Sequence, residues 1–95
     1  MTISVIGLNH KSASLDVREK YSFTGDACSL LLRRIKKIPE INEVLVISTC
    51  NRTEIYADSE SGSNNIQDWL ASEKEYRAFT DHMYVYQEED AIRHL

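Results

Sequence analysis

The chain has 95 residues, with 15 acidic against 11 basic side chains and a formal net charge of −4. This length allows one domain with a single core and excludes a two-domain enzyme, while 42% hydrophobic and 27% charged residues exclude a disordered or fibrous chain. The acidic balance excludes long-range steering of nucleic acid by the domain as a whole, so any nucleic-acid contact must be local.

The N-terminal residues predict a strand, a loop and a short helix. Residues 3–8 alternate apolar and small side chains over strand length, and residues 9–12 break that pattern. A short helix is expected over 15–21, and either Ser14 or Asp16 has a side chain suited to cap its first turn.

A longer amphipathic helix follows, with Thr24 as its expected N-cap and Pro39 marking its end. Its apolar positions recur at helical spacing: Ala27, Leu30, Leu31, Ile35 and Ile38. Between them stand the cations Arg33, Arg34, Lys36 and Lys37. These cations are candidates for contacts with RNA phosphates, but a solvated helix face whose charges suit the helix dipole is the favoured interpretation.

The second half of the chain predicts three more strands and two more helices. Residues 44–47 and 53–57 are strand-like runs joined by a four-residue turn. A polar turn at 58–65 leads into a helix, whose apolar face contains Ile66, Trp69 and Leu70. Residues 83–86 form a last short strand, and 88–95 begin a helix with acidic side chains in its first turn.

The order strand, helix, strand, strand, helix, strand predicts the fold. It is the split βαβ pattern of an α+β, ferredoxin-like sandwich, with a four-stranded antiparallel sheet and helices on one face. The last helix stops with Ala91, Ile92 and Leu95 lacking the turns that would continue their apolar face. We therefore expect the sequence to be a piece of a longer chain.

The two cysteines, Cys28 and Cys50, are too few for a disulfide framework, and no further cysteine completes a zinc spacing. His82 beside Asp81 has no second pair of ligands nearby, so no metal site is expected. The chain starts without a basic leader and apolar stretch, and no run is long enough to cross a bilayer. These features favour a cytoplasmic protein without a membrane partner.

Cys28 lies in a helical segment with no cation or base beside it, which favours a structural role.

The turn Thr49-Cys50-Asn51-Arg52 is the strongest candidate for chemistry. Only the thiolate of cysteine is a competent nucleophile, and a nearby guanidinium stabilises that anion. Arg52 is also able to hold the carboxylate of an acidic substrate bidentately, and the spacing leaves both roles open. The alternative is that Cys50 is a small buried side chain, which its polar neighbours disfavour.

The motif Ser-Thr-Cys-Asn-Arg-Thr-Glu-Ile-Tyr at 48–56 resembles the N-terminal catalytic domain of glutamyl-tRNA reductase. Residues 7–13 (Gly-Leu-Asn-His-Lys-Ser-Ala) and Arg18-Glu19 followed by Phe23 belong to the same resemblance, which covers the whole chain. One departure is Ser14, where the family usually has proline, and it affects only loop stiffness.

The resemblance implies that 1–95 is a single N-terminal catalytic domain that ends inside the first part of a further helix. The NADPH-binding domain and the helical dimerisation domain would then be absent. No glycine-rich phosphate loop occurs in these residues, so this piece is not expected to bind NADPH. The implied full-length protein is a homodimer that takes glutamyl-tRNA(Glu) as substrate.

The implied activity is NADPH-dependent reduction of tRNA-bound glutamate to glutamate-1-semialdehyde, in tetrapyrrole biosynthesis. The Cys50 thiolate would attack the glutamyl ester to form a thioester, which NADPH then reduces. By the same resemblance, Thr49, Asn51 and Arg52 contact the substrate together with Cys50, Arg52 takes the substrate carboxylate, and His94 is a second catalytic residue.

Other residues carry weaker predictions. His10 is expected either to line the same pocket or to make a structural hydrogen bond, and Glu54 to position Arg52 or the loop rather than act as an acid or base. Trp69 and Tyr56 are expected to pack in the core. The alternative function is a non-enzymatic ferredoxin-like binding module in which Cys50 is incidental. A further possibility is that the isolated domain acts only as an esterase.

Overall fold

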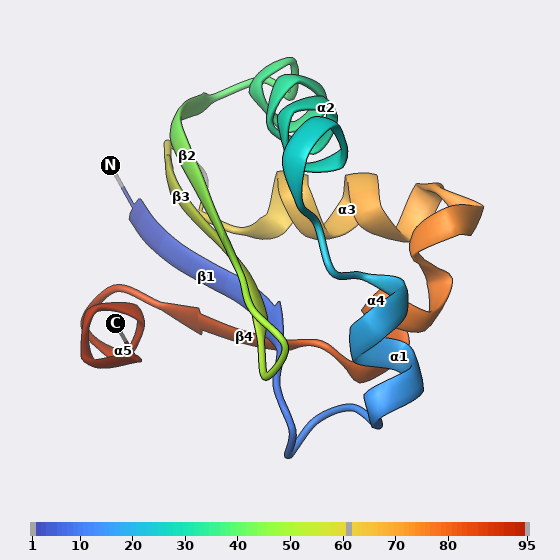
Figure 1. Cartoon of the computed structure of the whole chain (residues 1–95). Helices are drawn as coiled ribbons and strands as arrows, with labels where there is room; N and C mark the ends of the chain where they lie inside the picture. Colours follow the sequence, from blue (N-terminus) through green and yellow to red (C-terminus); the bar gives the residue numbers. More distant parts are fainter. Residues whose placement is uncertain (1, 61, 95) are drawn as a thin grey trace.

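The computed structural model describes residues 2–60 and 62–94 (Figure 1). Four strands form one sheet: β1 (Thr2–Leu8), β2 (Ile41–Ser48), β3 (Thr53–Ser59) and β4 (Tyr84–Gln87). Their spatial order is β2-β3-β1-β4, and each neighbouring pair is antiparallel. This arrangement confirms the predicted α+β sheet, since β3 lies between the two strands that the first helical connection joins.

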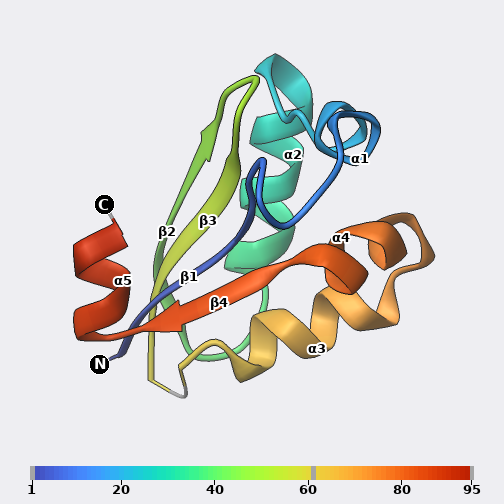
Figure 2. The same ribbon diagram turned by 90° about the horizontal axis from the view of Figure 1, so that it is seen from below.

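The helices are short and most of them lie on one side of the sheet. They are α1 (Leu15–Lys20), α2 (Gly25–Lys36), α3 (Asn64–Ser72), the 3₁₀ helix η1 (Lys74–Tyr76), α4 (Arg77–His82) and α5 (Glu89–His94). Figures 1 and 2 show α2, α3 and α4 covering one face of the sheet, with α5 alone on the other. The main helices are thus on one face, as predicted, and the terminal helix is the exception.

Strand periodicity explains why both faces of the sheet can be covered, because successive side chains point to opposite faces. The main core joins alternate strand residues to α2, α3 and α4: Ile6, Leu8, Ile55, Ala57, Leu31, Ile35, Ile66, Leu70 and Phe79. The intervening residues, Val5 and Tyr56, instead pack against Ala91 of α5, with Ile3 and Ile47 around them. The sheet therefore has a large core on its helical face and a small one beneath α5.

The ends of the first two helices agree with the residues that the sequence indicated for them. The Ser14 hydroxyl accepts a hydrogen bond from the Val17 amide at 3.5 Å and caps α1, whereas Asp16 lies inside the helix. Thr24 occupies the N-cap position of α2 without a side-chain capping bond. Strand β2 begins at Ile41, earlier than the predicted run 44–47, and has an irregularity next to Glu43.

Two elements were missed, namely η1 and α4, which fill the stretch between α3 and β4. Their residues lack a clear apolar period, yet Phe79 is fully buried in the main core. Of the apolar residues that the sequence places in the terminal helix, Ala91 is buried and Ile92 is 55% exposed. Leu95 and Ser61 lie outside the described residues. Within the described part of the chain, no helix has the length and apolar character needed to cross a membrane.

Candidate active site

The four-residue loop between β2 and β3 is organised by its own first residue. The Thr49 amide donates to the Arg52 carbonyl at 2.8 Å, which closes the hairpin. The Thr49 hydroxyl accepts hydrogen bonds from the amides of Asn51 at 3.3 Å and Arg52 at 3.2 Å. Such a local bond from a threonine oxygen replaces a backbone turn. Thr49 therefore shapes the loop that carries Cys50.

Cys50 is exposed, as its polar neighbours predicted, and the alternative of a small buried side chain is excluded. Its backbone carbonyl accepts a hydrogen bond from Arg18 of α1 at 3.3 Å, a contact between residues 32 apart in the sequence. Cys28 on α2 is half-buried by contrast. The loop thus presents one uncovered thiol whose backbone is anchored to a neighbouring helix.

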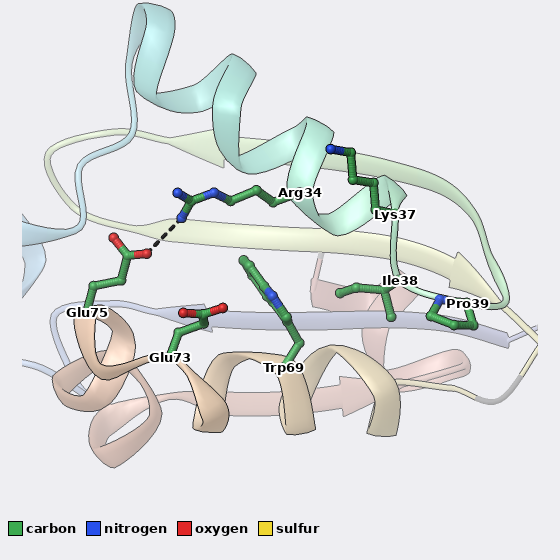
Figure 3. A pocket seen from close by; sticks show the side chains of 7 residues that line it. All are labelled: Arg34, Lys37, Ile38, Pro39, Trp69, Glu73 and Glu75. Carbon is green, nitrogen blue, oxygen red and sulfur yellow. Dashed lines mark hydrogen bonds and ion pairs between the residues drawn. The ribbon is translucent and has the colours of Figure 1, made fainter.

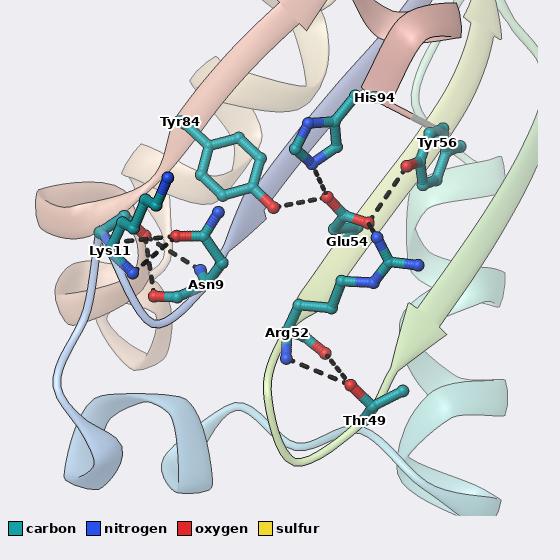
Figure 4. A network of polar contacts seen from close by, with 9 residues as sticks. Asn9, Lys11, Thr49, Arg52, Glu54, Tyr56, Tyr84 and His94 are labelled. Carbon is teal, nitrogen blue, oxygen red and sulfur yellow. Dashed lines mark hydrogen bonds and ion pairs between the residues drawn. The ribbon is translucent and has the colours of Figure 1, made fainter.

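Glu54 is the centre of a polar network on the α5 face of the sheet (Figure 4). It follows the loop by two residues, and its side chain is fully buried. Its Oε1 accepts from the Tyr56 hydroxyl at 3.1 Å and pairs with the Arg52 guanidinium at 3.3 Å. Its Oε2 accepts from the Tyr84 hydroxyl at 2.5 Å and bonds to Nε2 of His94. A buried carboxylate needs such partners because an unpaired charge there is very costly.

Glycine at position 7 makes room for this carboxylate. Gly7 is opposite Glu54 in the pairing of β1 with β3 and opposite Tyr84 in the pairing of β1 with β4. A methyl group added at Gly7 would lie 2.8 Å from Cγ of Glu54 and 3.0 Å from the Tyr84 hydroxyl. Only hydrogen fits at this point of the sheet, because any larger side chain would occupy the space of the network.

His94 reaches the same network from α5. Its ring centroid is 5.2 Å from that of Tyr84 and 5.0 Å from that of Tyr86, the two residues that alternate on one face of β4. These ring contacts and the bond to Glu54, which is 40 residues away in the sequence, fix the imidazole over the sheet. The side chain keeps 23% of its surface exposed.

The phenols of the network stay protonated over a wide pH range. Burial raises the pKa of Tyr56 to about 12, and the nearby negative charge of Glu54 adds to the shift. Burial, followed by the hydrogen bond to Glu54, raises the pKa of Tyr84 as well. Ionising either hydroxyl would place a second anion beside the carboxylate in a poorly solvated space. Both hydroxyls therefore remain donors to Glu54.

A cleft of about 350 Å³ opens next to this network. It is lined by Asn9, His10, Thr49, Asn51, Arg52 and His94. The structure thus brings together four of the five predicted site residues, and it also places His10 in the wall, one of the two options for that residue. Cys50 is exposed on the same loop but is not one of the lining residues. Asn9 shapes the opposite loop, since its side-chain oxygen accepts from the amides of Lys11 at 2.9 Å and Ser12 at 3.1 Å.

A larger hollow of about 570 Å³ lies on the helical side of the sheet (Figure 3). It is lined by Arg34, Lys37, Ile38, Pro39, Trp69, Glu73 and Glu75. An ion pair of 2.7 Å between Arg34 and Glu75 spans it. The lining contains no thiol, hydroxyl nucleophile or imidazole, so we place the candidate active site at the Cys50 loop instead.

The sequence indicated the loop residues and His94, whose roles stay predictions, but gave little sign of the buried side chains that hold them in place. It gave Glu54 a role in positioning Arg52, which the 3.3 Å ion pair confirms, and did not anticipate its bonds to His94 or the tyrosines. One sequence feature could have indicated a role for Tyr84, namely its place in a short strand, where it shares a face with Tyr86. The expectation that Tyr56 is a packing residue is confirmed by its burial, although its hydroxyl also serves the network.

Comparison with known proteins assigns the family. Residues 6–95 match the model of the glutamyl-tRNAGlu reductase N-terminal domain. The chain belongs to this family. Among its relatives, the glutamyl-tRNA reductase of Xanthomonas campestris pv. phaseoli is 41% identical over 95 residues, which are all of this chain and 22% of the relative. The glutamyl-tRNA reductase of Xylella fastidiosa strain M23 is 40% identical, with 100% and 21% covered.

A solved structure supports the fold of this chain. Glutamyl-tRNA reductase from Methanopyrus kandleri superposes with a TM-score of 0.69 and 24% sequence identity, covering 97% of this chain and 20% of that chain. The chain therefore spans about a fifth of the length of the proteins that it matches. The family confirms the resemblance seen in the nonapeptide at 48–56.

Proposed function

We propose that this domain performs acyl transfer from glutamyl-tRNA(Glu) to Cys50, the first half of a glutamyl-tRNA reductase reaction in tetrapyrrole biosynthesis. The observation that carries the proposal is the exposed thiol on a hairpin whose neighbouring residues, Asn51 and Arg52, line a polar cleft together with His94. Family membership supplies the substrate class, which this geometry suits.

The chemical step uses the thiolate as nucleophile. The sulfur of Cys50 attacks the ester carbonyl carbon, a C–S bond forms, and the ester C–O bond breaks as the 3′ oxygen of the tRNA leaves and takes up a proton. The product is a glutamyl thioester on the loop. A thioester is a better electrophile than the original ester, which is the benefit of the covalent step.

Arg52 is proposed to bind the side-chain carboxylate of the glutamyl group. One nitrogen, Nη1, is paired with Glu54, and this pair orients the guanidinium. The Arg52 side chain is 39% exposed, and it lines the cleft, so its remaining N–H groups are available to a ligand. A guanidinium held by a buried carboxylate loses little freedom when it binds a second carboxylate.

NADPH does not fit the residues of this chain. The three glycines of the chain, Gly7, Gly25 and Gly62, are far apart in the sequence, and none begins the glycine-rich turn that holds a dinucleotide phosphate. We therefore assign hydride transfer from NADPH, and assembly into a homodimer, to other parts of the longer protein. A cytoplasmic location also stays a prediction.

The test is intact-protein mass spectrometry after incubation with glutamyl-tRNA. The wild-type chain should gain the mass of one glutamyl group, in an adduct that hydroxylamine removes as expected of a thioester. Cys28→Ser should gain the same mass, and Cys50→Ser should not. An adduct that persists in Cys50→Ser, or its absence from the wild type, would contradict the proposed nucleophile and favour a binding module.

A further inference from the structure

The two nitrogens of His94 have different surroundings. Nε2 is bonded to the buried carboxylate of Glu54, whereas Nδ1 has no hydrogen-bond partner among residues 2–60 and 62–94. The ring also lines the cleft beside the Cys50 loop, with 23% of the side chain exposed. Nδ1 is therefore the nitrogen left for a ligand.

The partners of Glu54 decide which way the hydrogen bond to His94 runs. Arg52 presents only N–H donors, and Tyr56 and Tyr84 both present hydroxyl donors. A carboxylate in an ion pair with a guanidinium is an acceptor at both oxygens. Nε2 of His94 must then be the donor in its own bond to Glu54, as in other carboxylate–imidazole pairs.

We propose that Glu54 is a positioning residue that holds neutral His94 in the tautomer with hydrogen on Nε2, so that the lone pair of Nδ1 accepts a hydrogen bond from the α-ammonium group of an aminoacyl substrate. The identity of the substrate rests on the proposed function. The groups that face the imidazole are Glu54 on β3 and Tyr84 and Tyr86 on β4.

This arrangement gives the cleft two groups with opposite hydrogen-bonding roles. Arg52 offers donors and a positive charge, which suit the side-chain carboxylate of a glutamyl group. His94 offers an acceptor, which suits its ammonium group. Both residues depend on the same buried carboxylate, because Arg52 pairs with Oε1 and His94 with Oε2. Glu54 thus fixes the relative placement of the two groups that would bind the ends of the amino acid.

The tautomer can be measured directly by ¹⁵N NMR on the 95-residue chain with labelled histidine, and this measurement needs no variant. In its neutral form, His94 should show a protonated, pyrrole-type Nε2 and an unprotonated, pyridine-type Nδ1. Glu54→Gln should shift this balance towards a mixture of tautomers, because an amide is able to donate as well as accept. Tyr84→Phe, which keeps the carboxylate, should leave Nε2 protonated. Hydrogen on Nδ1 in the wild type overturns the proposal.

The role towards the substrate needs a second readout. The probes are thioesters of a small thiol with glutamate, joined through its α-carboxyl, and with glutarate, which lacks the α-ammonium group. In the reaction the Cys50 sulfur forms the new C–S bond, and the small thiolate leaves and takes up a proton. Rates of Cys50 acylation are divided by the rates of the same probes with free glutathione, which removes their intrinsic difference in reactivity.

After this correction, wild type should react with the glutamyl probe roughly 10- to 100-fold faster than with the glutaryl probe. This ratio corresponds to the free energy of one hydrogen bond to a charged group. His94→Phe, which keeps an aromatic ring against Tyr84 and Tyr86, should lose most of that preference. An equal preference in the two proteins overturns the assignment of the α-ammonium group to Nδ1. If neither probe acylates wild-type Cys50, the proposed function fails, while the NMR result still decides whether Glu54 sets the tautomer.

Discussion

Gly7→Ala is the sharpest test of how the sheet makes room for Glu54. The new methyl group would lie 2.6 Å from the backbone oxygen of Thr53, 2.8 Å from Cγ of Glu54 and 3.0 Å from the Tyr84 hydroxyl. The first of these atoms belongs to the paired strand β3 and is unable to swing away. Strands β1 and β3 must therefore separate, and the carboxylate and the phenol must move apart.

The expected cost has two parts. Overpacking of a well-packed interior costs about 1–3 kcal/mol. Weakening the hydrogen bond of Tyr84 to a buried charged group adds roughly 1.5–3 kcal/mol. The free energy of unfolding should therefore fall by about 2.5–6 kcal/mol, which is a large part of the roughly 5–14 kcal/mol expected for a domain of this length. The site should suffer as well, because the Glu54 contacts to Arg52 and His94 depend on the same position of the carboxylate.

The assay is urea unfolding followed by circular dichroism, with Gly25→Ala as the matched control. Gly25 has a positive φ of 54°, and a methyl group there meets nothing within 4 Å. That variant should lose only about 1–2 kcal/mol from backbone strain. If Gly7→Ala loses no more stability than Gly25→Ala, or if both match the wild type, the argument that Gly7 makes space for the network is refuted.

Three further predictions test the loop and the network. Iodoacetamide should alkylate the exposed Cys50 well before the half-buried Cys28, as followed by peptide mass spectrometry, and equal or reversed labelling would favour an incidental thiol. Because the pKa of Tyr56 is raised to about 12 in the folded chain and lies near 10 in the unfolded chain, the free energy of unfolding should be unaffected by this group below about pH 10 and fall as the pH rises towards 12. Tyr56→Phe should reduce that alkaline loss in urea titrations, and an unchanged slope would contradict the assignment. Thr49→Val removes the acceptor of two loop amides and should lower the free energy of unfolding by about 0.5–1.5 kcal/mol, while Thr49→Ser should restore it.

Local periodicity accounts for the parts of the fold that were predicted from the sequence. The strand-like runs on either side of Cys50 became β2 and β3, and the apolar spacing that includes Leu31 and Ile35 became the buried face of α2. The stretch of η1 and α4 was missed because its helices are only 3 and 6 residues long and show no clear repeat. Phe79 is helical there because the core holds it, not because of a local pattern.

The amino-acid sequence by itself determined the hairpin, the exposed position of its cysteine and the family, because these depend on neighbouring residues and on a contiguous motif. Only the tertiary structure decided what surrounds Glu54. Its partners Tyr84 and His94 are 30 and 40 residues away, and they meet it through the pairing of β1 with both β3 and β4 and through α5 folding onto the sheet. Such contacts follow from strand order and register, which set the distances between residues that no local spacing relates.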